Sequence, residues 1–175
     1  GDSYLQGFSY FMVILCTVFD ETEHAKADAF WCFSSLVGII RPMMPDFNCG
    51  WFEWNKTFWI NSLIKKIGKE RPLLEAIICE EMEIFSSLIL VKWYMLWFSQ
   101  NIVYEEVVEL WDFLLSLSED KLMHAYNSIA LVIISQAADD IVYKCGGQST
   151  PVICQLLDLK VSNVQKLIAI TKKTL

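Results

Sequence analysis

Residues 104–117 have the sequence YEEVVELWDFLLSL, and the pattern of this stretch decides the fold class. Apolar residues recur in it at intervals of three and four, which is the spacing of one face of an α-helix. Glutamate and aspartate residues lie between them. The stretch therefore predicts an amphipathic helix that packs against other helices. The side chains expected on its inner face are those of Val107, Val108, Leu110, Trp111, Leu114 and Leu115.

The same spacing continues towards both ends of the chain. The four prolines and seven glycines fall between the periodic segments, where they interrupt helices. No segment shows the alternation expected of a strand. The sequence therefore predicts a single all-α domain over residues 1–175, with about eight to nine helices. The other expected helices cover residues 7–19, 24–40, 51–67, 72–80, 83–99, 121–142, 150–157 and 162 onwards.

Residues at the ends of several predicted helices carry the signals of helix caps. Gly68 is expected to close one helix, and Pro72 to stand in the first turn of the next. Serine, threonine and proline signals mark two later helix starts. These signals are the pair Thr150–Pro151 and the capping box of Ser162 and Gln165.

The formal net charge of the chain is −7, which argues against nucleic acid as a partner because phosphate binding needs clustered lysine and arginine. The densest basic groups, residues 65–69 and 172–173, are expected to be solvated helix faces. No transmembrane segment is expected, because no stretch has the ~20 clean apolar residues that a membrane helix needs. Lys92 interrupts residues 83–100, and residues 83–99 predict a central core helix instead.

Six cysteines and two histidines provide little for a metal site, and none is predicted. No pair of cysteines has the C-x-x-C spacing typical of zinc sites. Cys16, Cys32 and Cys79 lie within apolar helical patterns, so they are expected to be buried core residues with free thiols. Free thiols indicate a reducing, intracellular setting.

The residues suggest no catalytic site of the chain's own. Cys145 precedes Gly146 and Gly147, but no histidine lies close to it in the sequence to act as a base. The sequence contains no glycine-rich phosphate loop and no dinucleotide motif. Among the seven tryptophans, Trp51 and Trp54 are expected to be partly exposed because they adjoin a proline-containing loop.

Three segments of the chain, in this order, resemble motifs of the TBC domain family. Residues 4–9, YLQGFS, are similar to the family's Tyr-x-Gln-Gly-Met-Asn motif. Glu23, followed by AFWCF at residues 29–33, resembles its acidic residue and Ala-Phe-Trp-Cys-Phe helix. Residues 92–112, which contain KW, FS and VELWD, are similar to its Arg-Trp, Leu-Phe-Ser and Leu-Trp-Asp run. The resemblance extends over essentially the whole chain.

The resemblance implies an all-helical domain that binds Rab GTPases in their GTP state and accelerates hydrolysis with an inserted arginine and an inserted glutamine. The motif places the glutamine at Gln6, where it would orient the attacking water, and Tyr4 would help to shape it. Gly7 and Ser9 would complete the part that binds the partner. No cofactor is expected beyond the Mg²⁺ that the Rab itself holds. The expected location is the cytoplasm, including the periphery of endomembranes.

The arginine is the main departure from the family pattern. The family carries it upstream of the glutamine motif, within Ile-x-x-Asp-x-x-Arg, whereas Arg41 and Arg71 lie outside any such motif and are interpreted as helix-end residues. Two explanations stay open: a fragment without the N-terminal helices of the domain, or a naturally short and inactive protein. A fragment would expose apolar surface on its first helices, which predicts a partner chain or a dimer that covers them.

Two further hypotheses compete with a GTPase activator. The first is a TBC-like scaffold that binds a Rab or another protein without catalysis. The second is an unrelated helical adaptor in which the motifs are coincidental. An upstream arginine motif would distinguish an activator from the scaffold, and a helix order unlike that of the TBC fold would favour the adaptor.

Overall fold

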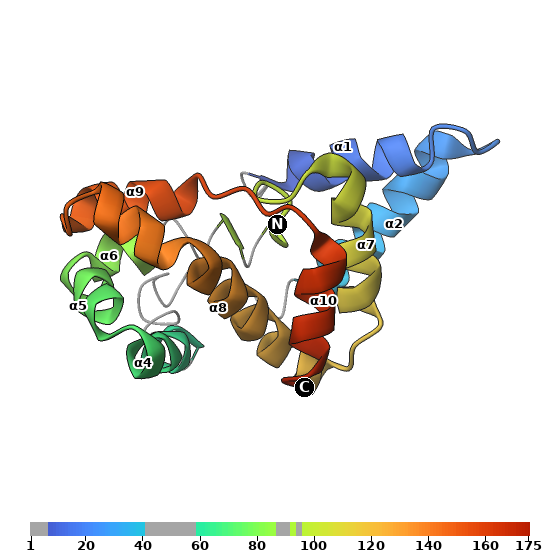
Figure 1. Cartoon of the computed structure of the whole chain (residues 1–175). Helices are drawn as coiled ribbons and strands as arrows, with labels where there is room; N and C mark the ends of the chain where they lie inside the picture. Colours follow the sequence, from blue (N-terminus) through green and yellow to red (C-terminus); the bar gives the residue numbers. More distant parts are fainter. Residues whose placement is uncertain (1–6, 41–58, 87–91, 94–95) are drawn as a thin grey trace.

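The computed structural model describes residues 7–40, 59–86, 92–93 and 96–175, and they form an α-helical structure (Figure 1). Nine helices lie within these ranges, and the expectation of an all-α domain is confirmed. The helices are α1 (Phe8–Val18), α2 (Ala25–Ile40), α4 (Trp59–Glu70), α5 (Pro72–Glu80), α6 (Met82–Ile84), α7 (Tyr104–Leu115), α8 (Glu119–Lys144), α9 (Ser149–Leu157) and α10 (Val164–Lys172).

Helix α8 lies in the middle of the arrangement (Figure 1). Helices α4, α5, α6 and α9 lie at one end of the molecule, and α1, α2, α7 and α10 lie at the other. Both α4 and α9 contact α8, while α10 contacts α7 and α8. Helices α1 and α2 pack against each other as a hairpin whose tip projects away from the rest of the chain.

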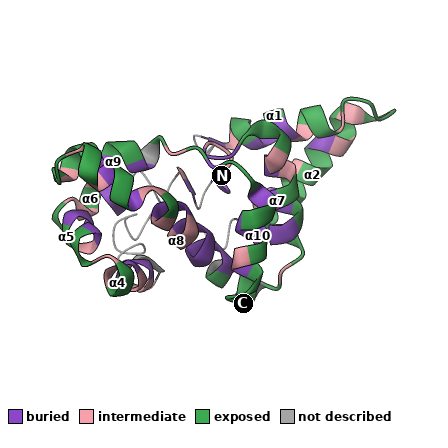
Figure 2. Ribbon diagram, viewed as in Figure 1, coloured by how far each residue is buried: buried purple, intermediate pink, exposed green. Residues whose placement is uncertain are grey.

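Helix α8 is central because apolar side chains cover more than one of its sides. Buried residues recur along its length, as Figure 2 shows. Full burial of one leucine or isoleucine side chain stabilises a fold by roughly 1.5–3 kcal/mol, so this helix contributes much of the core. Its buried apolar residues are Leu122, Ala125, Tyr126, Ile129, Ala130, Ile133, Ile134, Ala138 and Ile141.

The helix predicted over residues 83–99 is wrong at its C-terminal end, whereas the described residues 85–86 and 92–93 are helical, of the π type. Helix α6 ends at Ile84, and residues 96–100 form turns. Trp97 and Phe98 have positive φ values of 48° and 59°, which a right-handed helix excludes. Both side chains are fully buried, so the expected burial at the end of this segment is confirmed although its helical form is not.

Two predicted helix ends need correction. Helix α4 continues past Gly68 to Glu70. Gly68 therefore lies within the last turns of the helix instead of closing it, close to the side-chain carboxylate of Glu75 in α5. Helix α9 begins at Ser149, ahead of the pair Thr150–Pro151 that was expected to start it.

Helix α10 is capped by Asn163 and not by the predicted Ser162. The Asn163 side chain accepts a hydrogen bond from the Lys166 amide at 2.9 Å. Asn163 has a φ of 74°, a left-handed conformation that asparagine tolerates better than most residues. The Val164 amide donates to Glu106 of α7 at 3.1 Å, so the first turn of α10 is also anchored to its neighbour.

Helix α7 follows its predicted pattern with one exchange. Most of the expected inner residues are buried, but Leu115 is 47% exposed, and Phe113 is buried instead. The packing of α10 against α7 explains the exchange. Lys172 of α10 lies 5.4 Å from the centre of the Phe113 ring, which is a cation–π distance.

The expectation that Cys16, Cys32 and Cys79 are buried is wrong, because all three are exposed. Helix α1 buries Phe11 and Ile14, and Cys16 does not share their face. An apolar sequence pattern predicts a helix but does not show which of its sides another element covers.

The described residues also bear on membranes and metals. Among the described helices, none combines the length and the apolar character that a bilayer span requires. Within the same parts of the chain, the His, Cys, Asp and Glu side chains form no group that could hold a metal ion.

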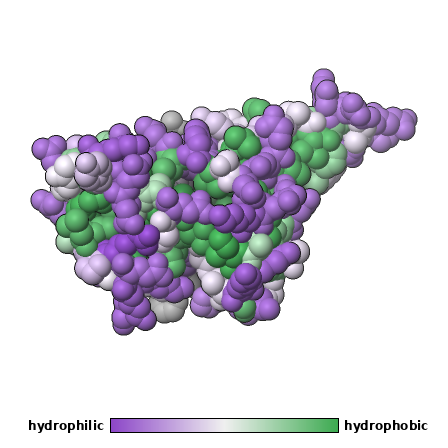
Figure 3. All heavy atoms as spheres, viewed as in Figure 1, coloured by the Kyte–Doolittle hydropathy of each residue, from purple (hydrophilic) through white to green (hydrophobic). Residues whose placement is uncertain are grey.

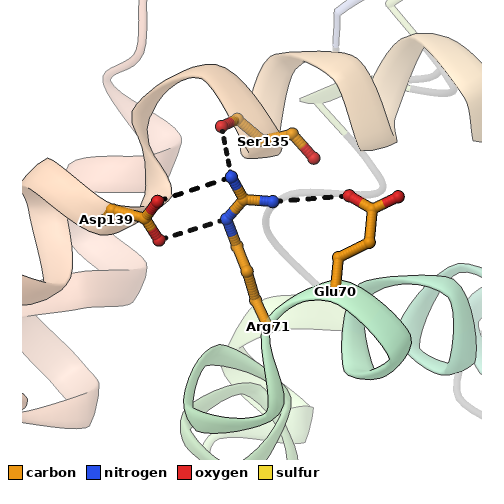
Figure 4. A network of polar contacts seen from close by, with 4 residues as sticks. All are labelled: Glu70, Arg71, Ser135 and Asp139. Carbon is orange, nitrogen blue, oxygen red and sulfur yellow. Dashed lines mark hydrogen bonds and ion pairs between the residues drawn. The ribbon is translucent and has the colours of Figure 1, made fainter.

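Arg71 connects the start of α5 to the central helix (Figure 4). Its Nε donates to Asp139 Oδ1 at 3.2 Å, and a terminal nitrogen donates to the Ser135 carbonyl at 3.1 Å. Another terminal nitrogen lies 3.4 Å from Glu70 Oε2. Because Ser135 and Asp139 belong to α8, this Arg71 clamp holds α4 and α5 against it. Arg71 is the N-cap residue of α5, in agreement with its predicted place at a helix end.

We expect Arg71→Met to lower the free energy of unfolding by about 1 kcal/mol or more, because its bond to the Ser135 carbonyl is partly buried. The Asp139 carboxylate is 83% exposed, so its ion pair adds little. Lys144→Met is the control, since Lys144 and Asp140 form an ion pair with both side chains 63% exposed. Such a pair contributes less than about 1 kcal/mol. Urea unfolding of both variants measures the difference, and equal losses would contradict the clamp.

Asn163→Ala should destabilise the protein by about 2 kcal/mol, because it removes the cap and forces alanine into a left-handed conformation. Asn163→Gly removes the same side chain but relieves the backbone, so its cost should be clearly smaller. Thermal unfolding of the two variants checks the order. A larger loss for the glycine variant would show that backbone strain has no part in the effect.

Candidate functional site

Gly7 is the N-cap residue of α1, with a φ of 113° and a ψ of −22°. Its carbonyl accepts a hydrogen bond from the Tyr10 amide at 3.0 Å, which closes the first turn of the helix. Gly7 is buried, and a Cβ atom at this position would lie 2.6 Å from Leu96 Cδ2. The site therefore requires glycine for two reasons, its backbone conformation and the closeness of Leu96.

Leu96 begins the left-handed turn, by which we mean residues 96–98. Positive φ values at two consecutive bulky residues, Trp97 and Phe98, are unusual and cost energy. The Trp97 carbonyl accepts a hydrogen bond from Trp111 Nε1 at 3.2 Å, and this bond is buried. Helix α7 thus supplies the donor that holds the turn in place.

Aromatic rings surround the left-handed turn and connect three helices. The Phe11 ring of α1 lies 4.9 Å from Trp111 of α7 and 6.4 Å from Trp97. The Phe98 ring stacks on Tyr126 of α8 at 5.9 Å. We call these five residues the aromatic junction. Their edge-on and offset geometries are those that aromatic rings prefer, so the junction fixes α1 relative to α7 and α8.

The structure describes two of the four predicted site residues. Gly7 lies against the left-handed turn, and Ser9 is exposed in the first turn of α1. Tyr4 and Gln6 lie outside the described residues. Sequence reasoning missed Leu96, because nothing in the local pattern shows that it contacts Gly7.

Two other groups singled out in the sequence also lie outside the described part of the chain. These are Arg41 and the tryptophans Trp51 and Trp54. Arg71, by contrast, is engaged by α8 through the Arg71 clamp.

Comparison with protein families gives one match. The family model for the Rab-GTPase-TBC domain matches residues 2–142 of the chain. The chain belongs to this family. No curated protein and no solved structure matches it. The resemblance found in the sequence motifs is thereby confirmed.

The matched part of this TBC domain contains the aromatic junction and all four predicted site residues. It extends from the start of α1 through most of α8. Family membership implies interaction with Rab GTPases in general and an association with GTPase activation.

The α1–α2 hairpin of the TBC domain has an apolar outer surface. Residues 8–19 and 29–40 contain no charged side chain, yet many of them are exposed. Figure 3 shows apolar surface over this hairpin beside its hydrophilic tip. A helix that is apolar all round is normally covered, and patches of this kind mark contact sites. The large exposed apolar side chains of the hairpin are Tyr10, Val13, Val18, Phe30, Trp31 and Ile39.

The sequence did not predict that Trp31 is exposed, but its exposed fraction of 68% is the largest among the exposed large apolar residues described in α2. Its ring packs edge-on against Phe30 at 5.4 Å. Phe33, two residues after Trp31, packs edge-on against Phe8 of α1, with the ring centres 5.9 Å apart. The exposed pair therefore lies on the same hairpin as Gly7 and the predicted finger motif.

A groove of about 670 Å³ lies between α8 and α9. Its lining includes Asp140, Lys144, Asp158 and Lys160. Lys144 pairs with Asp140 at 2.6 Å, and Lys160 donates to the Gln100 carbonyl at 2.5 Å. Two of its lysines are thus engaged within the protein, and the groove contains none of the predicted site residues.

Lys92 occupies the place of the arginine in the family's Arg-Trp pair. Burial lowers the pKa of its ammonium group below the usual value. The Asp158 carboxylate opposes this shift, and the Lys160 ammonium adds to it. The side chain is therefore part of a charge cluster with two residues of the segment between α9 and α10.

Gly7→Ala should lower the free energy of unfolding by about 2 kcal/mol or more, because a left-handed alanine costs roughly 1–2 kcal/mol before any clash with Leu96. Gly38→Ala in α2 is the matched control. A Cβ atom at Gly38 meets nothing within 4 Å, so this change should stabilise the protein by roughly 0.5–1 kcal/mol. Urea unfolding checks both signs, and a neutral Gly7→Ala would contradict the described conformation.

Proposed function

We propose that this TBC domain is a GTPase-activating domain for a Rab-type small GTPase, and that Gln6 orients the hydrolytic water. The observation that supports this most is the conformation of Gly7. A left-handed glycine, packed on Leu96, directly follows Gln6 at the start of α1, inside the segment that matches the family. A tight turn at this point suits a side chain that must reach out of the domain into a partner.

In this proposal the domain positions the attacking water and forms no covalent bond itself. In GTP hydrolysis the attacking water must lie in line with the leaving oxygen of GDP, and charge is spread over the transferred phosphoryl group. A glutamine amide can accept a hydrogen bond from that water and donate another to the phosphoryl oxygens. The Rab holds the nucleotide and its Mg²⁺, so the TBC domain needs no cofactor of its own.

The remaining motif residues would support the glutamine. Tyr4 would shape the segment before it, and Gly7 would provide the turn after it. Ser9 is exposed in the first turn of α1 and would contact the partner. A serine hydroxyl is shorter than the amide of the family's asparagine, so its contact would be closer to the α1 backbone.

This chain supplies no arginine in the motif position, and this should limit its effect on hydrolysis. An arginine finger accelerates GTP hydrolysis by about 10³–10⁵. Neither arginine of the chain lies in the family's arginine motif, and Arg71 is held by Asp139 and Ser135. We therefore expect the chain alone to accelerate hydrolysis only weakly.

The second candidate function is a scaffold that binds a Rab without accelerating hydrolysis. The exposed apolar surface of the α1–α2 hairpin favours it, because such a surface can bind a partner with no catalytic group. The two candidates differ in one respect, which is whether Gln6 matters for hydrolysis.

We expect single-turnover GTP hydrolysis by one member of a Rab panel to be faster with an excess of this protein. Gln6→Ala should lower the added rate at least about tenfold, since water orientation is lost, while Rab binding changes little. Gln136→Ala, a change at an exposed residue of α8, is the control and should leave the rate unchanged. Binding of the GTP form with no added rate in any variant would favour the scaffold.

A further inference from the structure

We propose that Thr150 is a phosphorylation site for a proline-directed protein kinase, and that its phosphate pushes the start of α9 away from the junction of α5 and α6. Thr150 lies in the first turn of α9, at the end of the molecule opposite α1 (Figure 1). It lies beyond the residues that match the family, so its modification does not depend on the proposed role of Gln6.

The sequence around Thr150 has the feature by which this class of kinase selects its substrates, a proline directly after the acceptor residue. Proline has no backbone N–H, so a kinase groove that offers no acceptor at that position tolerates proline and rejects other residues. Thr150 is the only serine or threonine of the sequence that a proline follows. The other three prolines follow Arg41, Met44 and Arg71.

The structure leaves this segment open to a kinase. The side chains of Thr150 and Pro151 are both exposed. The chain reaches them through Gly146 and Gly147, which have positive φ values and open space at their Cβ positions. The N-cap residue of α9, Gln148, makes no side-chain hydrogen bond to the helix. A helix start without such a cap opens more readily than the middle of a helix, so the segment can extend into a kinase groove.

In the unmodified protein, the hydroxyl of Thr150 joins α9 to the junction of α5 and α6. Its Oγ1 donates a hydrogen bond to Glu81 Oε1 at 2.7 Å. Glu81 is both the C-cap residue of α5 and the N-cap residue of α6, and α5 and α9 also contact each other. Because the hydroxyl is the donor of this bond, a phosphate on the same oxygen removes the attraction.

Phosphorylation also reverses the sign of the interaction with Glu81. The kinase breaks the bond between the γ-phosphorus of ATP and the oxygen that bridges to the β-phosphate, and a bond from phosphorus to Thr150 Oγ1 forms. ADP leaves, and the hydroxyl proton passes to the catalytic base of the kinase. The new group carries a charge of about −1.5 to −2 at pH 7. It lies beside the negative Glu81 carboxylate, so the contact becomes repulsive.

Helix α9 itself should keep its helical form. A phosphate is favourable at a helix N-terminus, because the first amide groups of the helix point towards it. The side chains of Val152, Ile153 and Leu156 are fully buried, and α9 contacts α8 as well as α5. The repulsion therefore displaces the first turn of α9 from Glu81 and leaves the rest of the helix in the core.

The first test incubates the protein with ATP and either a cyclin-dependent or a mitogen-activated protein kinase, and locates the phosphate by peptide mass spectrometry. Thr150 should be modified, whereas Thr22 and Thr174, which are exposed but not followed by proline, should not. Pro151→Ala should lower the initial rate at least about tenfold, and Thr150→Ser should keep it. Absence of phosphate from Thr150 with both kinases, or an unchanged rate in Pro151→Ala, would overturn the site.

The second test measures the displacement of α9 by amide hydrogen exchange. The Glu81 amide donates to the Ile77 carbonyl at 3.3 Å, and the Phe85 amide donates to the Glu81 carbonyl at 2.9 Å. These two amides lie at the junction that α9 covers. Their exchange should become at least about fivefold faster in the phosphorylated protein, while exchange in α10 should stay unchanged.

Glu81→Gln is the matched control for the repulsion. Glutamine can still accept the hydrogen bond of the Thr150 hydroxyl, but it carries no charge. Phosphorylation of this variant should change exchange at the junction less than about twofold. Equal acceleration in the variant and in the unaltered protein, or acceleration in neither, would overturn the displacement of α9 by the phosphate.

Discussion

The hydrogen bond from Trp111 Nε1 to the Trp97 carbonyl is the constraint on which the rest of this structure depends. A left-handed turn cannot satisfy its carbonyls through a regular helix, and an unpaired buried carbonyl is costly. Helix α7 provides the missing donor from its inner face. With the turn fixed, Phe98 stacks on Tyr126 of α8. Phe11 of α1 packs against both Trp97 and Trp111.

Much of this fold could be predicted from the sequence where one side of a helix is apolar and the other polar. The ends of α1 and α5 were predicted to within a residue or so. The predicted end of the helix over residues 83–99 was wrong, because a stretch that is apolar on all sides carries no information about where a helix stops. The prediction that Ser162 caps α10 was also wrong, because a contact between distant segments decides where this helix begins. The Val161 amide donates to the Asn101 carbonyl at 2.7 Å, and this distant contact delays the start of α10.

Only part of the candidate site could be predicted from the sequence. The turn at Gly7 could be predicted from the motif, because glycine adopts positive φ values more readily than other residues. Leu96 could not, since its contact with Gly7 joins segments far apart in the chain. The exposure of Trp31 and Cys32 could not be predicted either. Both belong to an apolar pattern, but whether a neighbour covers them depends on how whole helices are arranged.

The order of the aromatic junction along the chain has a consequence for biosynthesis. Phe11 is made well before Trp97 and Trp111, the two residues against which it packs. Until both tryptophans have left the ribosome, Phe11 and the uncharged residues 8–19 around it have none of these packing partners. Nascent chains that expose apolar surface are prone to aggregate, and α1 stays in this state until synthesis has passed α7.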